Sequence, residues 1–344
     1  MLLSARAALR RPAAAAAAVA AIGCGAAAAA TVTPTVVHAA PYAGGKMSSQ
    51  RGTDFSLTHH NHGKAKVRVL KVHRSKDGAG RHEISEFSVN TRLFSSEYAK
   101  VFTSDDNADL VATDTQKNTV YVVAKRTKCE TPEQFGIDMA EHLLREYPIL
   151  SAVEVDVSRA PWSRVVMDGA EHEHGFTKGS GEHAEAKVRL ERGGTPEVVS
   201  SIEDMTILKT TQSGFEGYKK DQYTLLPETN DRCLATELSA YWSYVPGSAP
   251  DYAKARLDVR KQLIQGIFGP VKGGVYSASL QATVYDAGCL VLKAAASVAQ
   301  ISISTPNLHY LPYKQLEQLG ESFENDVFVP TNEPSGTITC TVGR

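Results

Sequence analysis

The stretch ILKTTQSGFEGYKKDQYTLLPETNDR, residues 207–232, carries the pattern around which the rest of the chain can be placed. It opens on an apolar run typical of a strand, passes a glycine-flanked aromatic, Phe215, and ends on Arg232 beside Asp231. A flat anionic ligand needs such a pair, because a ring offers a face for stacking and a guanidinium offers a fork of donors for one edge. The residues alone leave the alternative open that Phe215 is core and Arg232 a surface ion pair.

The totals limit the class of protein. The chain has 344 residues, which suggests about two domains, and a formal net charge of −1, which gives no general attraction to nucleic acid or to a membrane surface. Its five cysteines are scattered and no C-x-x-C occurs. That argues against a disulfide framework or a structural zinc site and fits a reducing compartment.

Residues 1–58 are interpreted as an N-terminal leader. Arginines precede long alanine runs, and no acidic residue appears before Asp54. This composition is typical of an organellar transit peptide. Two alternatives remain open: a transmembrane helix over the nearly uncharged residues 12–32, and low-complexity sequence upstream of a start at Met47.

Residues 59–203 and 204–344 show the same order of hydrophobic patterns, which predicts strand–strand–helix–helix–strand–strand in each. Two such copies indicate an α+β fold built by tandem duplication. In the first copy the expected strands are 66–74, 82–94, 152–158 and 184–190, and the helices are 115–126, capped by Thr113 and Asp114, and 134–147, started by Thr131 and Pro132. In the second copy the expected strands are 205–210, 233–244, 301–305 and 336–342, and the helices are 250–268 and 279 to about 299.

Two further expectations concern the second copy. The helix at 250–268 is expected to turn one apolar side inward, formed by Ala253, Leu257, Ile264 and Ile267. Residues 318–335 are expected to form a surface loop.

Four segments in the same order resemble the urate oxidase (uricase) family, and the resemblance runs from about Asn61 to Arg344. They are residues 207–232, VATDTQKNT at 111–119, SASLQATVYD at 277–286 and TPNLHYL at 305–311, and the ending GTITCTVGR resembles the last strand of the family. The resemblance implies the tunnelling fold for each copy. It also implies a homotetramer in which the sheets close into a barrel around a tunnel.

By the same resemblance, one set of residues binds urate and another handles protons. The urate set is Phe215, Arg232, Leu280, Gln281 and Asn307, with Thr113 and Asp114 beside it. The proton-handling set is Lys64, Thr113 and His309. The two sets are implied to come from different subunits, so that each site lies across a dimer interface.

The residue types suit those roles. Phe215 can stack on the purine, Arg232 can hold its anionic edge with parallel N–H bonds, and the Gln281 amide can donate and accept at once. Leu280 stands where the family has valine, and a backbone N–H survives that change. Asn307 is expected above the ring plane, where the family places dioxygen or water.

The implied reaction converts urate, dioxygen and water to 5-hydroxyisourate and hydrogen peroxide, on the route from urate to allantoin. No cofactor is expected, because the urate dianion itself gives electrons to oxygen. Two alternatives remain: a purine-binding protein of the same fold that has lost turnover, and a zinc-dependent pterin-forming hydrolase of the tunnelling fold. The expected partners are urate, dioxygen and further copies of this chain, with no nucleic acid and no membrane.

The expected location is the peroxisome, by analogy with the family, although the chain ends in Thr341-Val342-Gly343-Arg344 and not in a Ser-Lys-Leu type tripeptide. The alternative is the mitochondrion, through the leader.

Two histidine groups could be mistaken for metal sites. They are His59, His60 and His62, and the H-x-H pair His172 and His174. No third ligand is evident for the pair, and the family is regarded as cofactor-free, so we assign no metal to either group.

Overall fold

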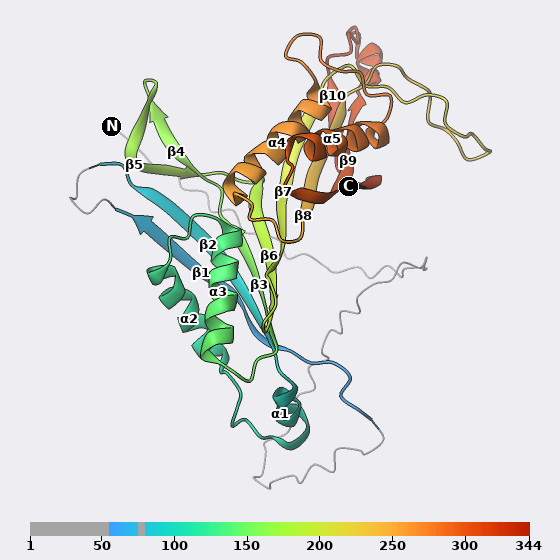
Figure 1. Ribbon diagram of the computed structural model, residues 1–344. Helices are drawn as coiled ribbons and strands as arrows, with labels where there is room; N and C mark the ends of the chain where they lie inside the picture. Colours follow the sequence, from blue (N-terminus) through green and yellow to red (C-terminus); the bar gives the residue numbers. More distant parts are fainter. Residues whose placement is uncertain (1–54, 75–79) are drawn as a thin grey trace, which may run out of the picture. The chain divides into compact units, whose positions relative to one another are not determined.

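The computed structural model describes residues 55–74 and 80–344, which belong to a single compact unit that begins at Gly52 (Figure 1). Most of the expected leader, the transmembrane alternative and the start at Met47 lie outside the described residues. Of the helices described, none has the length and the apolar character that crossing a membrane requires.

The elements follow the expected order twice, which confirms the α+β class. The first copy holds β1 (His62–His73), β2 (Glu83–Phe94), the short α1 (Ala99–Ser104), α2 (Thr113–Arg126), α3 (Pro132–Glu146), β3 (Ala152–Arg159), β4 (Trp162–Met167), β5 (Ala170–Lys178) and β6 (His183–Glu191). The second holds β7 (Glu197–Lys209), β8 (Leu234–Tyr244), α4 (Tyr252–Phe268), α5 (Leu280–Ala294), β9 (Val298–Pro312), β10 (Phe328–Thr331) and β11 (Thr337–Gly343). Short 3-10 helices lie at Ser96–Tyr98 and Lys314–Leu319.

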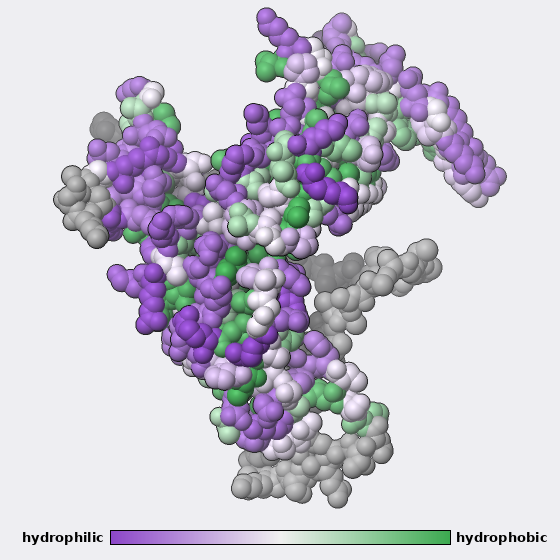
Figure 2. All heavy atoms as spheres, in the orientation of Figure 1, coloured by the Kyte–Doolittle hydropathy of each residue, from purple (hydrophilic) through white to green (hydrophobic). Residues whose placement is uncertain are grey.

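One antiparallel sheet of nine strands runs through both copies, in the order β1-β2-β3-β6-β7-β8-β9-β10, with β11 also paired to β9. Helices α2 and α3 lie over its first half, and α4 and α5 over its second half (Figure 1). Each pair of helices covers its own hydrophobic core, one around Phe87 and Phe135, the other around Trp242 and Leu263. On the face drawn in Figure 2, hydrophilic residues dominate and apolar residues show mainly in narrow strips.

The C-terminal ends of the main helices are capped by cations that reach them from the sheet. Lys71 of β1 donates to Ala124 O at the end of α2, and Arg192 after β6 donates to Leu144 O at the end of α3. In the second copy, Lys209 of β7 donates to Ile267 O of α4, and the terminal residue Arg344 donates to the carbonyl of Ala295 after α5. A cation there satisfies carbonyls that lack intrahelical partners and faces the negative end of the helix dipole. The same arrangement in both copies is what a duplication predicts.

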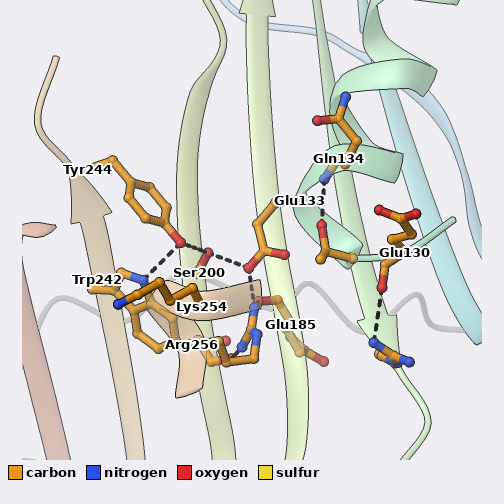
Figure 3. A network of polar contacts seen from close by, with 12 residues as sticks. Glu130, Glu133, Gln134, Glu185, Ser200, Trp242, Tyr244, Lys254 and Arg256 are labelled. Carbon is orange, nitrogen blue, oxygen red and sulfur yellow. Dashed lines mark hydrogen bonds and ion pairs between the residues drawn. The ribbon is translucent and has the colours of Figure 1, made fainter. Parts of the chain in front are cut away.

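A buried polar network joins the two copies (Figure 3). Glu133 at the start of α3 is fully buried, accepts a 2.6 Å hydrogen bond from Ser200 of β7 and forms an ion pair with Arg256 of α4. The Tyr244 hydroxyl of β8 lies 2.8 Å from Ser200 Oγ and accepts a bond from Trp242 Nε1. Breaking a buried ion pair leaves an uncompensated charge, so this network fixes how the copies pack.

Several local expectations were wrong. Thr113 is the first residue of α2, the cap residue is Ala112, and no side chain caps that end. On α4 the buried residues are Ala255, Val259, Leu263 and Ile267, whereas Leu257 is 68% exposed. The helix α5 ends at Ala294, about one turn before the expected end.

Two stretches also hold strands that the sequence did not indicate. The span 318–335, expected as a loop, contains β10. The hairpin of β4 and β5 has polar residues on both of its faces, so no clear alternation marks it in the sequence.

Candidate active site

Three segments meet at the end of the sheet where β7 stops and β8 starts. Gly214 N donates to Ser277 O at 2.9 Å, and Phe215 and Thr229 exchange backbone hydrogen bonds of 2.7 and 3.2 Å. Arg232 N donates to Ser213 O at 2.8 Å. These bonds fix Phe215, Arg232 and the chain entering α5 next to one another, although more than 60 residues separate Ser213 from Ser277.

Gly214 is required by this close approach. A Cβ atom at this position would lie 2.0 Å from the Tyr276 hydroxyl oxygen and 2.9 Å from Thr229 O. A larger residue would therefore push apart the segments that carry Phe215 and Arg232.

The Arg232 side chain is oriented toward the ring of Phe215, with its guanidinium carbon 5.3 Å from the ring centroid. Within the described part of the chain it has no carboxylate partner, and its Nε is buried without a hydrogen bond. Asp231 accepts a bond from Thr211 instead, at 2.8 Å. Burial lowers the pKa of Arg232, as expected for a cation withdrawn from water. The surface-ion-pair alternative is therefore wrong for Arg232.

Phe215 is half-buried and stacks on Tyr218, with ring centroids 4.8 Å apart and ring planes inclined by 10°. A stacked pair of aromatic rings therefore lies beside the guanidinium of Arg232. Ser213 Oγ, two residues away, is a second buried polar atom without a partner in the described residues. Buried polar atoms in proteins are nearly always paired, so two unpaired ones at one place indicate a site for a polar ligand.

The start of α5 supplies backbone donors to the same region. Ser279 caps the helix by accepting from Ala282 N at 3.1 Å. The first N–H groups of a helix, here those of Leu280 and Gln281, have no partner inside the helix and favour an anion. The Leu280 side chain is buried in the second core, so only its backbone can serve a ligand, whereas the Gln281 side chain is exposed.

Asn307 and His309 lie on β9. Asn307 is opposite Thr236 of β8 and donates its backbone N–H to Gly336 O at 2.7 Å, and His309 is opposite Thr331 of β10. Because Arg232 lies just before β8, the register brings this part of β9 to the same end of the sheet. His309 therefore lies on the same strand of the second copy as Asn307, whereas Lys64 and Thr113 lie on elements of the first copy.

Lys64, Thr113 and Asp114 lie together in the first copy. Lys64 is on β1 beside a bulge, opposite Thr91, and Thr113 opens the neighbouring α2. Asp114 is exposed and accepts hydrogen bonds from Lys117 and Asn118. The ammonium of Lys117, with a smaller contribution from Lys64, lowers the pKa of the Asp114 carboxyl. Among the described residues, no hydrogen bond, ion pair or ring contact joins this set to Phe215 or Arg232.

A wide groove on the described part of the chain lies elsewhere. Its volume is about 1010 Å³, and it runs between the end of β7, the outer side of α4 and the loop after α4. It holds none of the expected site residues.

The histidine groups pack against aromatic side chains. His62 lies edge-on to Tyr98, and His60 lies edge-on to Phe102. His172 and His174 share one face of β5, with ring centroids 4.6 Å apart. In the part of the chain that the structure describes, no cluster of three or more His, Cys, Asp or Glu side chains is arranged to hold a metal ion.

Comparisons with known proteins identify the family of the chain. The sequence matches the family model described as Uricase over residues 60–189 and 198–339. Uricase from Arabidopsis thaliana is 41% identical over 295 residues, covering 82% of this chain and 94% of that protein. Uricase-2 isozyme 1 of Glycine max is 39% identical over 293 residues, with the same coverage. The crystal structure of uricase from Arthrobacter globiformis superimposes with a TM-score of 0.76 at 32% identity, covering 85% of this chain and 96% of that one.

Proposed function

The chain belongs to the uricase family, and we infer that it is a urate oxidase whose substrate binds at Phe215, Arg232 and the start of α5. The reaction takes urate, dioxygen and water to 5-hydroxyisourate and hydrogen peroxide. The observation that carries the site is the Arg232 guanidinium, withdrawn from water beside the Phe215 ring with its Nε unpaired. A planar purine anion supplies a ring face that stacks on Phe215 and acceptor atoms for the guanidinium of Arg232.

Each remaining residue of the urate set has a defined task. The backbone N–H groups of Leu280 and Gln281 donate hydrogen bonds to the edge of the purine anion. The side-chain amide of Gln281 pairs with adjacent N–H and C=O groups of the ring. Asn307 holds dioxygen or water above the ring. His309, two residues further along β9, is placed to exchange protons with that water.

Lys64 and Thr113 complete the site from a neighbouring subunit, with Asp114 beside them. The support is that these residues occur in the first copy of the fold, away from Phe215 and Arg232 on the same chain. Their task is to take protons from urate, so that the dianion forms and can give electrons to oxygen. The oligomer proposed is a homotetramer whose sheets close into a barrel.

The division into repeats at 59–203 and 204–344 is part of this proposal. Its support is the equivalent cation caps, since Lys71 and Lys209 occupy the first strand of each copy and Arg192 and Arg344 follow the last. The strand β7 runs across residues 203–204 and continues the sheet from one copy into the next.

Aerobic incubation of the full chain with urate, after exhaustive dialysis against EDTA, tests the function. We expect urate absorbance to fall and one hydrogen peroxide to appear for each urate lost. Binding of urate without turnover would favour the inactive purine-binding alternative. Loss of turnover restored by one added metal would refute a cofactor-free reaction.

We propose a peroxisomal location, because a compartment that contains catalase removes the peroxide that the reaction makes. The mitochondrial alternative rests on the arginine-bearing, acid-free composition of residues 1–53. Fusing residues 1–53 to a fluorescent protein, beside a fusion to the full chain, tests the two. Mitochondrial signal from both fusions would refute the peroxisome, and overlap of the full-chain fusion with catalase would support it.

A further inference from the structure

Lys209, the last residue of β7, is a buried lysine with neutral partners. Its side chain donates to Ile267 O at 3.2 Å, to Val275 O at 2.8 Å and to Ser277 Oγ at 2.7 Å, and the residue is 8% exposed. Among the described residues it forms no ion pair. A buried lysine is costly unless it is fully hydrogen-bonded, so these acceptors determine where the ammonium can lie.

Two of the partners of Lys209, Val275 and Ser277, lie in the segment that builds the pocket. Ser277 O accepts from Gly214 N at 2.9 Å, Ser277 N donates to Gln212 O at 2.9 Å, and Ser213 O accepts from Arg232 N at 2.8 Å. Two residues after Ser277, Ser279 caps α5. One ammonium therefore ties the end of α4 to the segment on which both Arg232 and the anion-binding end of α5 depend.

We propose that Lys209 is a positioning residue for the urate pocket, acting through Ser277 on Arg232 and on the start of α5. It touches no substrate atom. The inference rests on the function proposed above and adds a residue that the resemblance to the family did not indicate. Without the ammonium, the buried oxygens of Ile267, Val275 and Ser277 lose their donor, and the 275–281 segment moves to find others.

Lys71 is the matched control in the first copy. It is the equivalent lysine of β1, donates to Ala124 O at 2.7 Å and to Thr127 O, and so caps α2 as Lys209 caps α4. Its partners are at the opposite end of α2 from Thr113. A loss that comes only from an uncapped helix should appear in both lysine variants, and a loss of pocket geometry should appear only at Lys209.

The experiment compares the full chain with Lys209→Met, Lys209→Arg and Lys71→Met. Three quantities are measured: the melting temperature, the Kd for xanthine (a purine that lacks the C8 oxygen of urate), and kcat and KM for urate. We expect Lys209→Met to raise the Kd and the KM about tenfold, as for the loss of one charged hydrogen bond. Its kcat should change far less, because the proton-handling residues keep their places.

Lys71→Met should lower the melting temperature to a similar extent and leave the Kd for xanthine unchanged. Lys209→Arg, which keeps the charge and the donors, should restore part of the affinity. If Lys209→Met does not fold, Ser277→Ala removes one acceptor only and should still weaken xanthine binding.

Wild-type affinity for xanthine in Lys209→Met would overturn the proposal, and so would wild-type affinity in Ser277→Ala if that variant is measured instead. An equal loss of xanthine affinity in Lys71→Met would also overturn it. Failure of the wild-type chain to oxidise urate would instead refute the proposed function.

Discussion

Arg232 is the single residue whose removal should weaken urate binding most. Its guanidinium is withdrawn from water and faces the ring of Phe215. Arg232→Ala should cost about 2–4 kcal/mol of binding free energy, because a desolvated anion loses its charged bidentate partner. Titration with xanthine measures this. Arg260→Ala is the control, since Arg260 is half-exposed and pairs with Glu182. Equal affinity in the two variants would place Arg232 outside the pocket.

Lys64 and Thr113 should affect the rate and not the affinity. Either residue replaced by alanine should lower kcat by about 10²–10⁴-fold, the usual contribution of a positioned proton-transfer group. The Kd for xanthine should stay close to that of the wild-type chain. Lys117→Ala, which removes a half-buried lysine bound to Asp114, is the comparison on the same helix. A Lys64→Ala protein with normal kcat would rule out the proton-handling role.

At the scale of elements, the contact of α3 and α4 with β7 and β8 depends on buried polar groups (Figure 3). Burial and the nearby Glu133 carboxylate raise the pKa of Tyr244 to about 12. A folded-state pKa above the unfolded value of about 10 means that the unfolded chain releases its proton first as pH rises. The stability that Tyr244 contributes is therefore complete below about pH 10 and is lost between about pH 10 and 12.

Tyr244→Phe should consequently be less stable than the wild-type chain at neutral pH, because Ser200 and Trp242 lose a hydrogen-bond partner. The difference in unfolding free energy should shrink by about 2–3 kcal/mol between pH 9 and pH 12, since phenylalanine has no proton to lose. Denaturant unfolding of both proteins at several pH values measures this. A difference independent of pH would contradict the assignment to Tyr244.

At the scale of the whole molecule, the proposed site takes residues from two chains. Lys64→Ala and Arg232→Ala proteins are each expected to be nearly inactive. In a dimer of one chain of each variant, one of the two shared sites combines Arg232 of the Lys64→Ala chain with Lys64 of the Arg232→Ala chain. That site is intact, so activity should return after subunit exchange. Mixing Lys64→Ala with Thr113→Ala is the control, because every site then carries one lesion. If documented exchange restored no activity in the first mixture, a site across the interface would be untenable.

The sequence by itself determined the types and the order of the main elements. Alternation at residues 66–74 and the Thr131–Pro132 start of α3 are local signals, because side-chain period and capping act over a few residues. The ordered motifs likewise identified Phe215 and Arg232 as candidates without any knowledge of their surroundings. These predictions needed no information about which strands pair.

The tertiary structure alone decided which segments of the chain contact each other. Ser213 and Ser277 pair across more than 60 residues, and no local periodicity specifies such a partner. Leu257 faces outward because packing of α4 on the sheet selected the neighbouring stripe through Val259 and Leu263. In the sequence Lys209 is one lysine among many. Its proposed role depends on burial between the end of α4 and the loop segment that carries Ser277, which only non-local packing creates.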